Sequence, residues 1–207
     1  MTKEDQYARQ AEAWTDRQYA DAASYLAHRA DLVVGLGPRL RPGDEVLDLA
    51  CGDGGFGEIL LGRGLRYRGV DSTPEMVAAA REHLAGRAEV ELGDLNDYVP
   101  SAPVATTTIF RAIYYARDRR ELFRRIAGYT ESKLVFDLNP RQYELDGVLA
   151  DLRAAGLGHI ALRPFFVPQT VALPRPLVAA ARTLERSGPF ARLALRVRFT
   201  YLVAAFR

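Results

Sequence analysis

The sequence predicts an α/β protein: a doubly wound, seven-stranded sheet that is mostly parallel and has an antiparallel last strand. Short apolar runs rich in β-forming residues alternate along the chain with segments of helical periodicity, a pattern typical of parallel sheets. The strongest run leads directly into a glycine-rich loop and then a helix, from Glu45 to Gly57. The last two runs lack the usual crossover, and the final strand is expected to be antiparallel.

The elements follow one another in a regular order. Helices are expected over 4–14 and 20–34, the second ending at Gly35, before a turn at Pro42-Gly43 starts the first strand. Ser72 or Thr73 is expected to cap a helix that begins at Pro74. The seven expected strands cover 45–50, 67–71, 88–92, 105–110, 133–138, 159–166 and 199–206. The other expected helices cover 56–61, 119–126, part of 143–155, and 176–196 with a break at Gly188-Pro189.

The composition predicts a single globular domain over residues 1–207. The chain is 48% hydrophobic and 26% charged with a net charge of +2, which argues against disorder and against a dominant nucleic-acid or membrane role. One cysteine excludes an internal disulfide framework, and the scattered histidines suit no metal site. The charged start and the lack of an apolar run of roughly 18 residues predict a cytoplasmic protein without a leader. The sequence does not indicate an oligomeric state.

Charge is distributed unevenly along this domain. Residues 1–151 hold 25 acidic and 19 basic side chains, whereas residues 152–207 hold nine arginines and one acidic residue, Glu185. The favoured interpretation places Arg182, Arg186, Arg192 and Arg196 on the solvated face of amphipathic helices. The basic segment also fits three other roles. It could cover a substrate pocket and attract an acidic substrate, form a helix on a membrane surface, or contact RNA.

Three carboxylates follow or end successive predicted strands and point to a ligand. Gly52, Gly54 and Gly57 spell G-x-G-x-x-G, which alone is a weak sign of a dinucleotide site. Asp48 before this loop would repel a pyrophosphate but suits an ammonium or sulfonium group. Asp71 can accept two ribose hydroxyl bonds, and Asp94 can accept from an adenine amino group. Together they describe a nucleoside with a cationic tail.

These motifs resemble those of class I S-adenosylmethionine-dependent methyltransferases over about residues 40–140. The run from Val46 to Gly54 resembles the family's first motif, Gly69-Val-Asp71 its second and Gly93-Asp94-Leu95 its third. The resemblance implies a cofactor-binding core over 41–140, with a helical lid at 1–40 and a substrate-side portion at 141–207. It implies these cofactor contacts: Asp48, Cys51, Gly52, Gly54, Asp71, Ser72, Met76, Asp94, Leu95, Phe110 and Tyr19. Ala50 departs from the glycine that many relatives have, and Cys51 is interpreted as a small apolar filler.

The acceptor is expected above the fourth and fifth strands. Arg111, Tyr114 and Tyr115 follow the fourth strand and are the candidate catalytic residues. The candidate substrate contacts are Trp14 in the lid and Asn139, Arg141 and Tyr143 after the fifth strand. Tyr25 is expected to pack its helix onto the sheet.

The predicted function is transfer of a methyl group from S-adenosylmethionine to an O or N atom of a small, moderately apolar metabolite. In-line displacement on an activated donor needs mainly positioning, and no metal. One alternative is an RNA methyltransferase that uses the basic C-terminal segment. Another is a protein of this fold that binds the cofactor without transferring methyl, and a dinucleotide enzyme is the least favoured.

Overall fold

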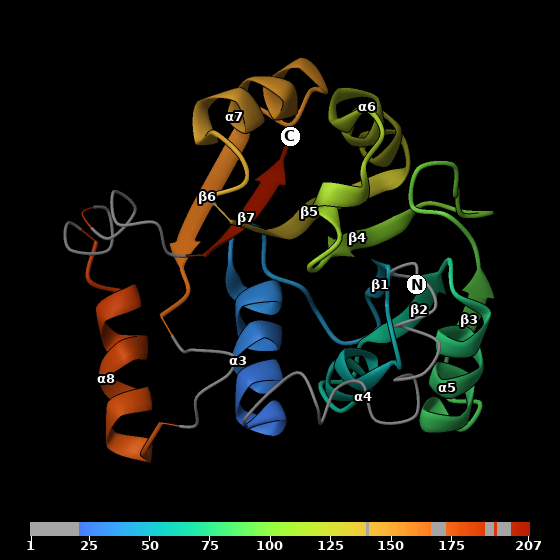
Figure 1. Cartoon of the computed structure of the whole chain (residues 1–207), viewed down its shortest axis with the longest axis horizontal. Helices are drawn as coiled ribbons and strands as arrows, with labels where there is room; N and C mark the ends of the chain where they lie inside the picture. The colour runs from blue at the N-terminus through green and yellow to red at the C-terminus, as the bar shows by residue number, and fades with distance from the viewer. Residues whose placement is uncertain (1–20, 140, 167–172, 189–192, 194–199) are drawn as a thin grey trace.

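The computed structural model describes residues 21–207 except 140, 167–172, 189–192 and 194–199 (Figure 1). A seven-stranded sheet runs through it in the order β3-β2-β1-β4-β5-β7-β6. The pairings among β1 to β5 are parallel, whereas β7 is antiparallel to both β5 and β6. This arrangement confirms the predicted fold class and the antiparallel last strand. The expected helix over 4–14 lies outside the described residues, as does most of the chain after the break at Gly188-Pro189.

Each expected strand is present, with ends that shift by a few residues. The strands are β1 (Glu45–Leu49), β2 (Arg66–Asp71), β3 (Glu89–Leu92), β4 (Val104–Ile109), β5 (Thr130–Leu138), β6 (His159–Pro164) and β7 (Tyr201–Phe206). The helices are α3 (Ala22–Gly35), α4 (Gly55–Leu61), α5 (Pro74–Leu84), α6 (Arg119–Tyr129), α7 (Leu145–Ala154) and α8 (Arg175–Glu185), with a 3-10 turn, η2 (Ile113–Tyr115). None of the helices in the described part of the chain is long and apolar enough to span a membrane.

The helices form two layers, one on each side of the sheet (Figure 1). In one layer α3, α4 and α5 pack over strand residues such as Val46 and Leu202, and in the other α6 and α7 pack over Leu47 and Phe136. Neighbouring residues of one strand therefore belong to different cores, because side chains alternate between the faces of a sheet. Helix α8 stands beside α3 at the end of the first layer (Figure 1).

Helix α3 packs on the sheet and is fixed at both ends. The Asp21 carboxylate accepts from the backbone N–H of Ser24 and caps the start. Past its end, the buried Lys133 ammonium on β5 donates to the carbonyl oxygens of Leu36, at 2.7 Å, and Pro38. Burial lowers the pKa of Lys133 to about 8. The helix that was expected as part of a lid is thus a core element, and Tyr25 is buried in it as predicted.

The four parallel strands β1 to β4 end at one edge of the sheet. Leu49 is level with Val70 and with Ile109, and Asp71 is level with Leu92. The loops that follow these strands therefore open side by side, which is the usual place for a ligand in a doubly wound fold.

Candidate active site

A cavity of about 570 Å³ lies among these loops. Twelve of the residues singled out from the sequence line it: Asp48, Cys51, Gly52, Asp71, Ser72, Met76, Asp94, Leu95, Phe110, Arg111, Tyr114 and Tyr115. The rest of the lining was not among the predicted site residues and comprises Leu26, Arg29, Ala50, Asp53, Phe56, Thr73, Gly93, Asn96, Ala112 and Arg117.

The loop after β1 turns sharply beneath the cavity. Ala50 and Gly52 both have left-handed backbone, at φ 64° and 58°. This conformation costs an L-residue with a side chain roughly 1 kcal/mol, so glycine would be less strained than Ala50 at this position. Gly54 caps α4 and does not line the cavity: a Cβ there would lie 3.2 Å from Ala80 and Leu84 of α5. Its role in the structure is to let the two helices approach.

Asp71 ends β2 with its carboxylate held by the main chain. Oδ2 accepts from the N–H of Gly52 at 2.9 Å, and Oδ1 from the N–H of Thr73 at 3.0 Å. Burial raises the pKa of Asp71, although these bonds act against the rise. The Thr73 side chain and the Ser72 N–H also interact with this carboxylate. Two neighbouring hydroxyl groups of a ligand would share its acceptor positions with these groups.

Asp48 lies deeper, within β1. Its carboxylate accepts from the hydroxyls of Tyr67, at 2.9 Å, and Thr108, at 2.6 Å. Burial raises its pKa to about 6, against the lowering effect of both hydroxyls. A cation in the cavity would favour the ionised form.

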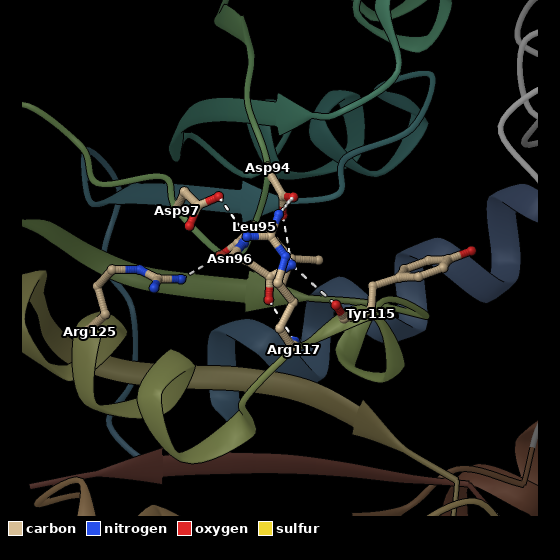
Figure 2. Close-up of polar contacts among 7 residues, drawn as sticks. All are labelled: Asp94, Leu95, Asn96, Asp97, Tyr115, Arg117 and Arg125. Carbon is tan, nitrogen blue, oxygen red and sulfur yellow. Dashed lines mark hydrogen bonds and ion pairs between the residues drawn. The ribbon is translucent and has the colours of Figure 1, made fainter.

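Asp94 lies beyond β3 in a polar network (Figure 2). Its Oδ1 atom accepts from the backbone N–H and the side-chain Nδ2 of Asn96, both at 2.8 Å, and its Oδ2 atom pairs with Arg117 at 2.7 Å. Burial opposes ionisation, but the bonds from Asn96 and the charge of Arg117 outweigh it and lower the pKa of Asp94. This carboxylate is ionised at neutral pH and can accept one further hydrogen bond.

The other end of the cavity combines aromatic rings with a buried ion pair. The Arg29 guanidinium lies 4.3 Å from the centre of the Phe110 ring and pairs with Asp137 at 3.2 Å. Asp137 also accepts from the backbone N–H of Arg111 at 2.7 Å, in a loop where Arg111 has a φ of 55°. Beyond it, the rings of Tyr114 and Tyr115 lie 4.4 Å apart at the rim.

A family of methyltransferase domains matches residues 46–132. This range includes the ends of β1, β2, β3 and β4 at the cavity, but not the end of β5. Over these residues the chain is similar to methyltransferase domains. Within this range, Cys51 has the role expected of an apolar filler. It is buried against Gly69, and burial raises the pKa of its thiol well above the usual range.

Known methyltransferases are similar in part or in fold. A methyltransferase of Schizosaccharomyces pombe is 37% identical over 70 residues, which cover 33% of this chain and 26% of that protein. The chain therefore matches about a quarter of this curated relative. The protein bound to the Trm112 methyltransferase activator of Haloferax volcanii has a TM-score of 0.67 at 20% identity over 97% of this chain and 96% of its own. A TehB-like methyltransferase of Corynebacterium glutamicum has 0.66 at 16% identity, covering 99% and 98%.

The fold does not bring every candidate residue to the cavity. Asn139, Arg141 and Tyr143 do not line it, because the chain turns away after β5 toward the layer of α6 and α7. The Asn139 side chain accepts from the N–H of Arg141 within this turn, and the Tyr143 ring faces the guanidinium of Arg119 at 5.4 Å. Trp14 and Tyr19 lie outside the described residues.

Sequence reasoning missed two kinds of lining residue. Arg29 had a usable signal, because it falls on the apolar face of its helix, three residues after Leu26 and four before Val33. Asn96 and Arg117 had none, since ordinary polar residues in loops do not reveal which loops meet.

Some arginines of the basic C-terminal segment form hydrogen bonds within the protein. Arg163, Arg182 and Arg207 donate to the carbonyl oxygens of Glu185, Ser24 and Ala127. These bonds stabilise the fold. Arg182 is half-buried and differs from the prediction, whereas Arg186 is exposed as expected, and Arg192 and Arg196 lie outside the described residues. In the described part of the chain, no group of three histidine, cysteine or acidic side chains could hold a metal ion.

Proposed function

We propose that this protein transfers the methyl group of S-adenosylmethionine to an O or N atom of a small, moderately apolar metabolite. The observation that carries the proposal is the convergence of Asp48, Asp71 and Asp94 on one cavity. Their hydrogen-bonding capacities match, in that order, a cationic amino-acid part, a ribose and an adenine. A pyrophosphate would meet two buried carboxylates, which disfavours a dinucleotide.

The residues present fit this cofactor. Asp71 offers a carboxylate for the ribose hydroxyls, and Met76 and Leu95 offer buried apolar surface for the base. Asp94 keeps one acceptor position for the amino group of the base. Asp48 and the backbone around Gly52 lie at the end proposed for the methionine part. When bound, S-adenosylmethionine supplies a methyl group that its sulfonium already activates.

The chain then has to position the acceptor and exclude water. Phe56, Phe110, Tyr114 and Tyr115 give the cavity apolar walls that suit a small metabolite. Alignment of reactants can contribute up to roughly 7–11 kcal/mol to such a displacement. Arg111, Tyr114 and Tyr115 stay the candidate groups that contact the acceptor, and a cytoplasmic location stays a prediction from the sequence.

The test is calorimetric titration of the full chain with S-adenosylhomocysteine. We expect Asp71→Asn to weaken binding by at least about tenfold, because a neutral amide replaces the charged acceptor of two hydroxyl bonds. Asp146→Asn, the same change at an exposed carboxylate on α7, should leave binding unchanged. Equal affinities for wild type and Asp71→Asn would remove Asp71 from the site.

An RNA methyltransferase is the alternative that the basic C-terminal segment favours. It predicts nucleic acid that co-purifies and binding that weakens steeply with salt. Absence of both, together with methyl transfer to small acceptors, supports the small-molecule proposal. Tight binding of S-adenosylhomocysteine with no turnover across a broad acceptor panel would instead favour a binding protein of this fold.

A further inference from the structure

The side chain of Asn96 joins two of the loops that line the cavity (Figure 2). Its Nδ2 atom donates to Asp94 Oδ1, at 2.8 Å, and to the carbonyl oxygen of Tyr115, at 3.1 Å. Its Oδ1 atom accepts from the backbone N–H of Arg117 at 2.8 Å. One amide group thus bonds the loop after β3 and the loop after β4 simultaneously.

Arg117 adds a second, weaker connection between the same loops. Its guanidinium pairs with Asp94 at 2.7 Å and with Asp97 at 3.2 Å, but its side chain is 66% exposed. Ion pairs in such an exposed position contribute little. Asn96 therefore supplies the main connection, and it does so with main-chain partners that cannot move independently of the loop.

The loop after β4 carries the proposed acceptor wall. The turn η2 places Tyr114 and Tyr115 on the cavity, and the loop is held on one side by Asp137 at Arg111 and on the other by Asn96 at residues 115 and 117. Removing the Asn96 bonds would take away two of the hydrogen bonds that hold this loop, those at the carbonyl oxygen of Tyr115 and the N–H of Arg117.

We propose that Asn96 is a positioning residue that couples binding of an adenine base at Asp94 to the ordering of the Tyr114–Tyr115 wall. The inference rests on the proposed function, because it takes Asp94 as the adenine acceptor. An amino group that bonds Asp94 can use Oδ2, which leaves Oδ1 with Asn96. When the Asp94 carboxylate is fixed by the base, its bond to Nδ2 fixes the Asn96 side chain. Asn96 in turn bonds Tyr115 and Arg117 in the loop after β4.

Asparagine suits this role because it donates and accepts from one planar group. An aspartate at position 96 would keep nearly the same shape but lose both donors and place a second negative charge against Asp94. Asn96→Asp therefore removes the coupling with little change in volume. Since Asn96 is only half-buried, the fold should tolerate the change.

The experiment measures amide hydrogen exchange of the full chain with saturating adenosine, homocysteine or S-adenosylhomocysteine. In the wild type, adenosine and S-adenosylhomocysteine should slow exchange across residues 112–117 by at least about fivefold, and homocysteine alone should not. In Asn96→Asp, and in the smaller variant Asn96→Ala, bound adenosine should no longer slow these amides. Asp97→Asn, which breaks only the exposed guanidinium contact, should retain the effect.

The outcomes separate this inference from the proposed function. Adenosine that binds the wild type without slowing residues 112–117, or that still slows them in both Asn96 variants, overturns the coupling and leaves the proposed function intact. A wild type that binds neither adenosine nor S-adenosylhomocysteine overturns both.

Discussion

Asp48 is the residue whose protonation the fold changes most clearly among the cavity carboxylates. Burial raises its pKa from 3.8 to about 6, so the folded protein holds a proton more tightly than the unfolded chain does. Ionisation between about pH 4 and pH 6 therefore lowers the free energy of unfolding, by on the order of 3 kcal/mol at most. Asp48→Asn should abolish this loss, which urea denaturation across that pH range measures. Parallel pH profiles for wild type and variant would contradict the raised pKa.

The same ionisation should govern cofactor affinity. A cationic ligand favours the ionised carboxylate, so the affinity of the wild type for S-adenosylmethionine should rise with pH through about 6. Asp48→Asn should bind more weakly above this pH and lose the dependence. Asp146→Asn makes the same change at an exposed carboxylate on α7, outside the cavity, and is the matched control for both measurements.

The cavity carboxylates at the strand ends could be predicted from the sequence, but the loop residues that contact them could not. Asp48, Asp71 and Asp94 each follow an apolar run, so the chain itself indicates that they share one edge of the sheet. Asn96 and Arg117 act through atoms of another loop, and local sequence does not encode which loops meet. Lys133 was placed correctly in a strand, but its bonds to the carbonyls beyond α3 depend on tertiary packing.

Among the described residues, helix α8 is attached to the core by a few apolar contacts and by one buried carboxylate. Val178 and Ala181 touch the core beside α3, and Glu185 is the fully buried residue of the helix. The Glu185 carboxylate bonds His28 Nε2 at 2.6 Å and accepts from the N–H of Phe166 at 2.8 Å. The sequence predicted an amphipathic helix here but could not show that its single acidic residue is the anchor.

We expect Glu185→Ala to release α8 locally, because the buried His28 and the half-buried Phe166 amide would lose Glu185 as their acceptor. Breaking such a buried pair costs about 3–5 kcal/mol. Hydrogen exchange over 175–186 should accelerate strongly, whereas amides of α5 keep their protection. Arg186→Ala changes the exposed neighbour on the same helix and should alter neither region. Unchanged exchange over 175–186 in Glu185→Ala would show that apolar packing alone holds the helix.

At the scale of the whole molecule, the two hydrophobic cores share one sheet. Strand β7 is last in the chain yet lies between β5 and β6, and its side chains alternate between the cores. Sequence patterns predicted seven strands and both layers, but the position of β7 depends on pairing between distant segments. Neither core can then lose its packing without disturbing the strands that support the other.

This sharing predicts one cooperative unit for the domain. Leu202→Ala, in the core under α3, and Phe136→Ala, in the core under α6, should each lower the free energy of unfolding by about 2–5 kcal/mol. Under native conditions either change should accelerate amide exchange equally in α4 and in α6, which lie on opposite faces. Urea titration gives the stability, and exchange resolved by helix gives the cooperativity. Loss of protection confined to the helices on the substituted face would mean that the two layers unfold separately, and that the sheet transmits less between them than its shared strands imply.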